Sequence, residues 1–328
     1  VNDAPTDIIL SANTVDENAA AATVIATLSA TDVDAAVGNA GPFTYALVAG
    51  DGTNDADNGL VTIVGDQLQV NGSIDFEANP TLELYIQVTD AGGESYTEAV
   101  TVTVNDVNEN PTAINLSATS IDENNASGAV VATLTATDPD GAASGYAGPF
   151  TYALVAGAGD TDNASFTIAG SNLQINNPAD FEGQNSFDIR LSVTDSGGLT
   201  YETTETITIN DVNENPTDIA LSASDVDENS ASGTVIATLS ATDPDGAASG
   251  FAGPFTYALV AGDGTNDADN GLVTIVGDQL QVNGSIDFET NPNLELYIQV
   301  TDADGLSYTE AESITVNDVN DAQTDIIL

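Results

Sequence analysis

Hydrophobic and polar residues alternate along short segments of this chain, and turn-forming residues separate the segments. Near the centre, Phe187, Ile189, Leu191 and Val193 follow one another at every second position. A period of two places these side chains on one face of a β-strand. No segment shows the 3.6-residue period of an amphipathic helix. The pattern therefore predicts an all-β chain.

About seven such segments lie between residues 112 and 209. They are 112–118, 129–137, 150–154, 166–168, 173–175, 187–193 and 201–209. Clusters of Asp, Asn, Pro and Gly separate them, and Asp138-Pro139-Asp140-Gly141 is the clearest of these turns. Seven short strands in a stretch of this length predict a Greek-key β-sandwich made of two sheets.

A polar linker recurs and divides the chain into three repeats. It reads NDVNENP at 105–111 and at 210–216, and NDVNDAQ at 317–323, while a shortened VNDAP opens the chain. The proline that ends the linker cannot continue a β ladder. We therefore predict tandem domains at 1–110, 111–215 and 216–322, with 323–328 as the start of a further repeat.

The first and third repeats share an identical run of 37 residues, 41–77 and 253–289. Near-identical blocks indicate recent duplication within a long array. A catalytic domain rarely needs tandem copies, whereas a spacer gains reach from each one. The repetition therefore favours a structural array.

The chain is strongly acidic, with 52 Asp and Glu residues against the single cation Arg190 and a net charge of −51. Such a surface repels phosphate, so nucleic acid is excluded as a direct partner and binding to anionic membrane is disfavoured. An acidic disordered tail is also excluded, because hydrophobic residues make up 41% of the chain and are periodic. Bound cations would relieve the self-repulsion and a saline habitat would screen it; both alternatives stay open.

Residue types that are missing narrow the chemistry further. The chain has no Cys, His or Lys, so disulfides, sulfur or imidazole metal sites and Lys cross-links are excluded. Oxygen ligands remain, and acidic oxygen-rich sites suit Ca²⁺. No apolar run reaches the ~18 residues of a membrane span, and no signal peptide is visible. We expect a segment of a longer array whose secretion signals lie elsewhere.

Acidic residues recur at the same places in all three repeats. A Glu follows the first strand, Asp-x-Asp follows the second, Asp-x-Glu precedes the sixth and an Asp ends the sixth. Strand ends of an antiparallel sandwich fall at its two poles, so the Glu and the Asp-x-Glu should meet at one pole. The Asp-x-Asp and the last Asp should meet at the other, next to the preceding linker.

Each acidic turn also has a simpler interpretation. A single Asp-x-Asp turn is more often a solvated turn than a metal site. Only its recurrence at the same place relative to each linker favours metal binding. The loop 51–59 superficially suggests an EF-hand, but Leu60 occupies the position where the tight turn of an EF-hand needs glycine. We therefore expect a flexible acidic loop. Tyr45, Tyr152 and Tyr257 occupy one strand position and are predicted to be core residues.

With these motifs in place, the chain resembles tandem cadherin repeats of the kind found in bacterial surface proteins. The calcium motifs XEX, DRE, DXNDN, DXD and XDX of that family correspond to the following segments: Asp16-Glu17-Asn18, Asp75-Phe76-Glu77, Asp106-Val107-Asn108-Glu109-Asn110, Asp138-Pro139-Asp140 and Thr194-Asp195-Ser196. Five motifs in the family order, repeated along nearly the whole chain, make the resemblance specific.

The resemblance implies three Ca²⁺ ions at each junction between repeats. Its ligands at the first junction would be Glu17, Asp75, Glu77, the carbonyl of Val107, Asn108, Glu109, Asn110, Asp138, Asp140 and Asp195. At the second they would be Glu123, Asp180, Glu182, Val212, Asn213, Glu214, Asn215, Asp243, Asp245 and Asp302. Half-sites would lie at the start (Asn2, Asp3, Asp32, Asp34, Asp90) and at the finish (Glu228, Asp287, Glu289, Asn320, Asp321).

Several residues depart from the family pattern. Glu109 and Glu214 replace the usual Asp, so their carboxylates sit one methylene further out. Phe replaces the Arg of DRE, and Ala4 and Ala322 replace the last Asn of the linker. The chain has no tryptophan, so the strand-swapping adhesion of some animal cadherins is not supported.

The function predicted from these features is a Ca²⁺-rigidified extracellular array, the stalk or filament of a secreted bacterial surface adhesin. The alternative is a cadherin-like module that binds carbohydrate or like repeats in cell–cell or biofilm adhesion. Expected partners are adjacent repeats of the same chain, like chains in a filament, or carbohydrate, with no nucleic acid and no membrane insertion. We do not expect an enzyme, because metal ligation accounts for the paired carboxylates.

Overall fold

The computed structural model describes residues 1–36, 41–141, 144–146, 148–246, 251 and 253–320. The chain divides into two compact units: Val1–Ser117, Ala132–Leu173 and Asp188–Glu205 form one, and Ala118–Val131, Gln174–Phe187 and Thr206–Leu328 form the other. The boundary between the units crosses the middle repeat. Each linker, together with the acidic motifs assigned to it, therefore lies within a single unit.

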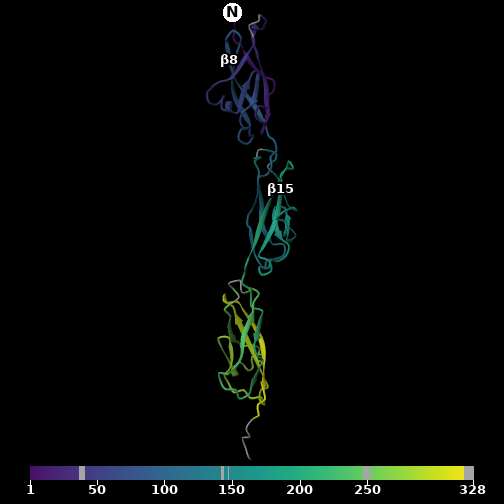
Figure 1. Ribbon diagram of the computed structural model, residues 1–328, viewed down its shortest axis with the longest axis vertical. Coiled ribbons are helices and arrows are strands. Elements are labelled where there is room, and N and C mark those ends of the chain that lie inside the picture. The colour runs from purple at the N-terminus through teal and green to yellow at the C-terminus, as the bar shows by residue number, and fades with distance from the viewer. Residues whose placement is uncertain (37–40, 142–143, 147, 247–250, 252, 321–328) are drawn as a thin grey trace, which may run out of the picture. The chain divides into compact units, whose positions relative to one another are not determined.

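Short strands make up the regular structure of every repeat, as the alternation predicted (Figure 1). The first repeat contains β1 (Asp7–Leu10), β2 (Thr14–Asp16), β3 (Val24–Thr31), β4 (Thr44–Leu47), β5 (Val61–Val64), β6 (Gln67–Val70), β7 (Thr81–Thr89) and β8 (Ser95–Asn105). The middle repeat contains β9 (Ala113–Leu116), β10 (Ser120–Asp122), β11 (Val130–Thr137), β12 (Thr151–Leu154), β13 (Phe166–Ala169), β14 (Asn172–Ile175), β15 (Ser186–Thr194) and β16 (Thr200–Asn210). The third contains β17 (Asp218–Leu221), β18 (Asp225–Asp227), β19 (Val235–Thr242), β20 (Thr256–Leu259), β21 (Val273–Val276), β22 (Gln279–Val282), β23 (Asn293–Thr301) and β24 (Ser307–Asn317).

The strands form pairs of four-stranded sheets. The orders are β1-β3-β6-β5 and β2-β8-β7-β4 in the first repeat, β13-β14-β11-β9 and β10-β16-β15-β12 in the middle one, and β17-β19-β22-β21 and β18-β24-β23-β20 in the third. Short 3₁₀ turns add to them: η1 (Val33–Ala36), η2 (Asn58–Leu60), η3 (Asn163–Ser165) and η4 (Asn270–Leu272). The predicted tandem β-sandwich fold is confirmed.

A short strand that the alternation did not predict follows the first predicted strand of each repeat and belongs to the other sheet. β1 pairs antiparallel with β3, whereas β2 pairs parallel with β8. Between them, the Ser11 hydroxyl oxygen accepts a hydrogen bond of 2.8 Å from the Thr27 N–H. A side chain thus replaces the backbone partner where the chain leaves one sheet for the other. This crossing places the acidic residues that follow β2 at the end of the second sheet.

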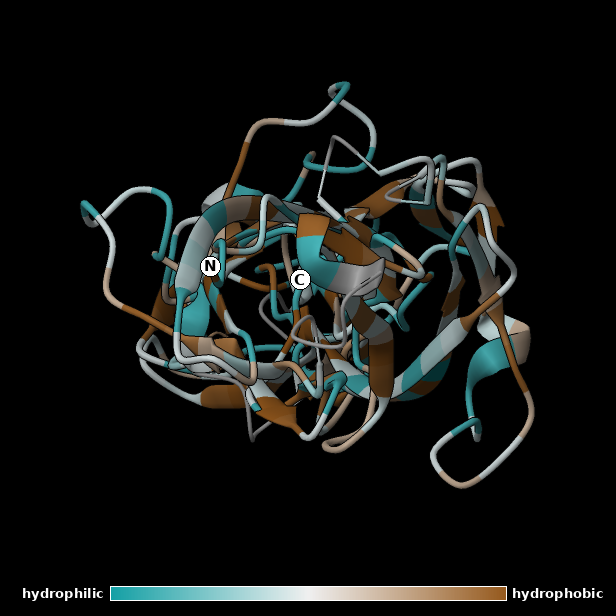
Figure 2. Ribbon diagram, turned by 90° about the horizontal axis from the view of Figure 1, so that it is seen from above, coloured by the Kyte–Doolittle hydropathy of each residue, from teal (hydrophilic) through white to brown (hydrophobic). Residues whose placement is uncertain are grey.

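The interior of each sandwich follows from the alternation along the longest strands. In β7, Leu82, Leu84, Ile86 and Val88 are completely buried, while the residues between them are half-buried. The two sheets of the first repeat face each other across these side chains and across residues such as Leu68. The same alternation appears as changes between brown and teal or white along the ribbons (Figure 2). Tyr45 and Tyr257 pack against the cores of their repeats, as predicted.

The loop 51–59 is fixed by its own carboxylates and amides. The Asp55 carboxylate accepts hydrogen bonds from Gly50 and Gly52 N–H, each 2.8 Å long. Asp57 Oδ2 accepts one of 2.8 Å from the Glu83 N–H, at the edge of β7. We predicted a flexible acidic loop, and in the structure its short Asp side chains bond to nearby backbone.

The burial pattern predicts that neighbouring residues of β7 tolerate truncation very differently. Replacing the fully buried Ile86 with Ala should lower the free energy of opening the first repeat by about 2–5 kcal/mol. The adjacent Gln87→Ala variant should stay within about 0.5 kcal/mol. Hydrogen exchange of the β7 and β8 amides in the full chain measures both. Equal effects would show that the register is wrong.

Candidate metal centre

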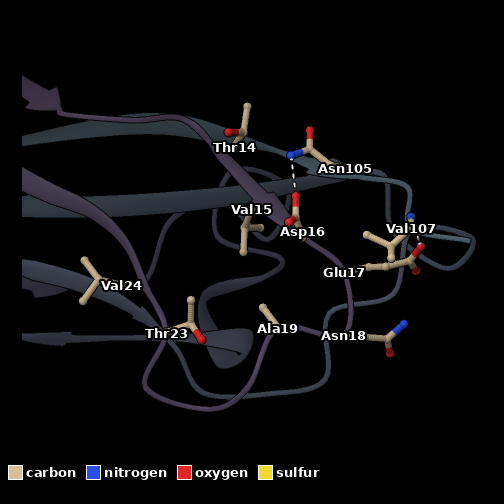
Figure 3. A pocket seen from close by; sticks show the side chains of 10 residues that line it. All are labelled: Thr14, Val15, Asp16, Glu17, Asn18, Ala19, Thr23, Val24, Asn105 and Val107. Atoms are coloured by element: carbon tan, nitrogen blue, oxygen red, sulfur yellow. Dashed lines mark hydrogen bonds between the residues drawn. The ribbon is translucent and has the colours of Figure 1, made fainter.

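A buried glutamate at the end of β2 connects two acidic motifs of the first repeat. Glu17 is only 3% exposed. Its Oε1 accepts a hydrogen bond of 2.7 Å from the Val107 N–H, and its Oε2 accepts one of 2.9 Å from the Phe76 N–H. Figure 3 shows the Glu17 side chain beside Val107. One carboxylate thus fixes both the linker and the Asp75-Phe76-Glu77 turn.

The middle and third repeats reproduce this connection. Glu123 accepts bonds of 2.8 Å from both Val212 N–H and Phe181 N–H. Glu228 accepts bonds of 2.7 Å from Val319 N–H and 3.0 Å from Phe288 N–H. The arrangement is therefore a property of the repeated motif.

The residue after each buried glutamate makes the local turn possible. Asn18, Asn124 and Asn229 have positive φ angles of 54–55°. Asparagine tolerates this left-handed conformation better than most residues with a side chain. The Asn18 N–H then donates to the Ile74 carbonyl at 3.0 Å, which brings the Asp75–Glu77 turn beside the glutamate.

The Asp-x-Asp motif of the middle repeat binds the same linker from the other end. Asp140 is completely buried, and its Oδ2 accepts a hydrogen bond of 2.8 Å from the Glu109 N–H. Asp138 Oδ1 accepts one of 3.1 Å from the Asp140 N–H. Asn108 Nδ2 donates to Asp195 Oδ2 at 3.1 Å. The first linker is therefore held by motifs that lie before and after it in the sequence.

Equivalent contacts occur at the second linker and at the start of the chain. Glu214 N–H donates to Asp245 Oδ2 at 2.7 Å, and Asn213 donates to Asp302 at 3.0 Å. Asp3 N–H donates to Asp34 Oδ2 at 2.7 Å, Asp34 N–H to Asp32 Oδ1 at 2.7 Å, and Asn2 to Asp90 at 2.8 Å. At the finish, Asp321 lies outside the described residues.

Carboxylates of these motifs come close enough to share a cation. In each of five sets, one oxygen per residue lies within 4.8 Å of the others: Glu17–Asp75–Glu77, Glu77–Asp106–Asp140, Asp138–Asp140–Asp195, Glu123–Glu182–Asp211 and Glu228–Glu289–Asp318. The second set combines a turn before the linker, the linker itself and a turn after it. Like charges so close together repel unless a cation or protons intervene.

Some residues in these sets were not predicted as ligands, and some predicted ligands fall outside them. Asp106, Asp211 and Asp318 open the linkers, and the motif alone did not indicate a ligand role for its first residue. Its recurrence at all three linkers was the available signal. Among the described residues, no close carboxylate set includes Glu109 or Glu214. The side chains of Asn110 and Asn215 are exposed.

Several carboxyl groups at the linkers have raised pKa values. Burial raises the pKa of Glu77, and the charges of Glu17, Asp106 and Asp140 raise it further. Burial raises the pKa of Asp106 too, with Asp140, Glu17 and finally Glu109 adding to the effect. The pKa values of Asp138, Glu182, Asp211 and Asp243 are raised in the same way, by burial first and then by neighbouring carboxylates.

Two carboxyls at the other side of the linkers behave in the opposite way. Burial alone would raise the pKa of Asp90, but hydrogen bonds from Asn2 and from backbone N–H groups lower it overall. Burial alone would also raise the pKa of Asp302. The hydrogen bond from Asn213 and those from the following turn outweigh it, so the pKa is lowered overall. These two carboxylates are therefore well prepared to stay ionised.

Buried oxygens without hydrogen-bond partners test whether a metal fits. In the described part of the chain, such oxygens include Asp106 Oδ1, Asn108 Oδ1 and Asp138 Oδ2 at the first linker, with Asp211 Oδ1, Asn213 Oδ1 and Asp243 Oδ2 at the second, and Asn2 Oδ1 and Asp32 Oδ2 at the start. Buried acceptors are normally satisfied. An all-oxygen, carboxylate-rich set with unsatisfied oxygens fits Ca²⁺.

The sequence profile of the cadherin domain matches residues 12–105 and 117–210. The chain belongs to the cadherin family. Cadherin domains bind Ca²⁺ at the junctions between repeats. Within the described residues, this cadherin has no helix long and apolar enough to span a membrane.

Comparison with individual cadherins supports the fold over nearly the whole chain. Human Protocadherin-16 is 29% identical over 255 residues, which cover 73% of this chain and 7% of that protein. The structure of Protocadherin Gamma B2 extracellular cadherin domains 1-5 matches 98% of this chain and 61% of its own, with a TM-score of 0.61 and 22% identity. A structure described as the Protocadherin gammaB7 EC3-6 cis-dimer matches 94% and 73%, with a TM-score of 0.57 and 22% identity.

The raised pKa values predict opposite pH responses with and without Ca²⁺. In chelator, lowering the pH from neutral toward the ordinary pKa range of carboxyl groups should raise the melting temperature. A group whose pKa is raised by folding stabilises the fold when protonated, and this contribution is lost as the pH rises through the raised value. Asp90 and Asp302 do not oppose this, because their stabilisation is lost only as the pH falls through their lowered pKa values.

With millimolar Ca²⁺ the same acidification should lower the melting temperature, because protons compete with the metal for the carboxylates. Calorimetry of the full chain in both buffers measures the two slopes. The Asp106→Asn variant, which removes one crowded charge, should show a shallower slope in chelator. Slopes of the same sign in both buffers would contradict the metal assignment.

Proposed function

We propose that this chain is a section of a Ca²⁺-stiffened extracellular array that holds a distal binding domain away from a cell, or builds a filament. The observation that carries the proposal is the Glu77–Asp106–Asp140 set, whose oxygens come from before, within and after one linker. A cation bound by all three would bridge the two repeats that the linker joins. The division into domains at 1–110, 111–215 and 216–322 is part of this proposal.

Three Ca²⁺ ions per linker agree with the charges available. Eight carboxylates belong to the first linker once Asp106 is included: Glu17, Asp75, Glu77, Asp106, Glu109, Asp138, Asp140 and Asp195. Six positive charges would leave a modest negative excess. Without the ions, even a solvated like-charge pair at ~4 Å costs about 1 kcal/mol, so the bare linker should splay.

A bacterial surface adhesin remains the proposed setting. The resemblance noted from the motifs supports it, and so does the identical run of 37 residues in two repeats, which suits a long array. Secretion to the cell surface follows from the same proposal, as does the absence of an enzymatic role. Metal ligation would account for the paired carboxylates of the linker motifs.

Contact between like chains is a second candidate function. The matched protocadherin gammaB7 structure is described as a cis-dimer. A lateral contact of that kind between copies of this chain would assemble stalks into a filament or support adhesion between cells. Carbohydrate binding is the remaining alternative, and a glycan array would separate it from contact between chains.

Stiffness should depend on Ca²⁺ and not on ionic strength alone. We expect a narrow, extended distribution of the radius of gyration in millimolar Ca²⁺, and broad distributions in chelator and in chelator with high NaCl. Salt screens repulsion but makes no bridges between repeats. Small-angle scattering in the three solutions is the measurement. If NaCl alone produces the stiff state, the cations act only as counter-charge and the ligand assignment fails.

Removing the Asp-x-Asp carboxylates should loosen one linker at a time. Asp138→Ala with Asp140→Ala removes two ligands of the first linker, and both carboxylates also hold backbone N–H groups there. The matched variant Asp243→Ala with Asp245→Ala does the same at the second linker. Paired spin labels across each linker should report broadening only at the altered one. Broadening at both linkers, or at neither, would argue against separate sites.

A further inference from the structure

The linker glutamate of each site is held at both its backbone and its side chain. Glu109 N–H donates to Asp140 Oδ2 at 2.8 Å, and Glu109 Oε1 accepts a hydrogen bond of 2.7 Å from Asn18 Nδ2. At the second linker, Glu214 N–H donates to Asp245, and Glu214 Oε1 accepts a bond of 2.7 Å from Asn124 Nδ2. Two independent copies of the arrangement agree closely.

The length of the glutamate explains its partner. An aspartate at this position would hold its carboxylate one methylene closer to the backbone, and the extra methylene of Glu109 carries the carboxylate out to Asn18. The backbone of Asn18 is fixed, because it is left-handed with φ 55° and its N–H donates to the Ile74 carbonyl. The amide donor therefore starts from a fixed point and has two rotatable bonds, whereas the Glu109 side chain has three.

The held carboxylate also lies among the other acidic groups of its linker. Glu109 is one of the charges that act on Asp106, and Glu214 acts on Asp211. A carboxylate has two oxygens, and Asn18 occupies only Oε1. Glu109 and Glu214 lie outside the closest carboxylate sets of the described residues, so an oxygen that is left over on each of them could add a ligand to a linker cation.

We infer that Asn18 and Asn124 are positioning residues for the linker glutamates: each binds one carboxylate oxygen and thereby orients the other toward the linker cation. This inference rests on the proposed function. Partners that orient a ligand in this way typically affect metal affinity by about 10–100-fold when they are removed. The expected effect is about tenfold, because Asn18 makes a single hydrogen bond to one ligand among several.

Glycine is the appropriate replacement for the asparagine. Asn18→Gly removes the amide but keeps the left-handed backbone, which glycine adopts readily. Asn18 lines an open pocket of about 580 Å³ together with Thr14, Asp16 and Asn105 (Figure 3). The space it vacates therefore joins that pocket, and no closed cavity forms.

The same pocket provides a control. Asn105 Nδ2 donates to Asp16 Oδ1 at 2.8 Å, shown as a dashed line in Figure 3. Asn105→Ala also removes an amide–carboxylate bond, but one that does not reach Glu109. A loss of affinity that follows from general disturbance of this region would appear in both variants.

Hydrogen exchange of the full chain during a Ca²⁺ titration measures each linker separately. The N–H groups of Val107 and Glu109 report on the first linker and those of Val212 and Glu214 on the second. In Asn18→Gly, the Ca²⁺ midpoint of the first linker should rise about tenfold while that of the second is unchanged. Asn124→Gly should give the reverse, and Asn105→Ala should change neither.

A fourth variant distinguishes positioning from an effect on the turn. In a Glu109→Asp background the carboxylate is too short to meet Asn18, so Asn18→Gly should cause no further shift. A tenfold shift in that background overturns the inference, as does an unchanged midpoint in Asn18→Gly alone. If the unaltered chain shows no Ca²⁺ response at either linker, the proposed function itself fails.

Discussion

Carboxylates held close together without a protein counter-charge are the constraint on which each linker depends. Glu77, Asp106 and Asp140 have oxygens within 4.8 Å of one another, and the chain's single cation, Arg190, is engaged with Glu202 at 2.7 Å. The protein's own cations therefore cannot neutralise these sets. The hydrogen bond from the Glu109 N–H holds Asp140 in place, so its carboxylate stays close to the other two and their repulsion favours an added cation.

The folded sandwiches hold the acidic turns in place, so their carboxylates stay close together. Buried strands such as β7 end at fixed points, and the acidic turns begin where those strands end. Glu17 is buried at the end of β2, and both its carboxylate oxygens accept hydrogen bonds from backbone N–H groups. The turn that Glu17 holds therefore cannot move away to relieve the repulsion. The repulsion between the carboxylates therefore acts on the short linker, and a bridging cation would remove it.

The sequence predicted the parts of this arrangement that depend on periodicity and on spacing. Alternation located the long strands, and the recurrence of the acidic motifs located residues such as Glu17 and Asp140 at opposite ends of a linker. It did not reveal the short strand that follows the first one on the other sheet, because the three residues of a strand such as Thr14–Asp16 are too few to show a period. The roles of Asp106 and Asn18 depend on where the folded turn brings them, and a pattern along the chain does not record this.

Cations at the linkers account for only part of the acidity. Eight acidic residues belong to each of the two linkers, so 36 of the 52 lie elsewhere. Some of these are satisfied locally, as Asp55 is by backbone N–H groups of its loop. Monovalent salt can screen those of the remaining charges that are exposed to solvent. It cannot replace an ion that several oxygens share at once. Ca²⁺ and a saline medium would therefore act on different charges of the same chain, and a habitat that supplies both would satisfy the two requirements together.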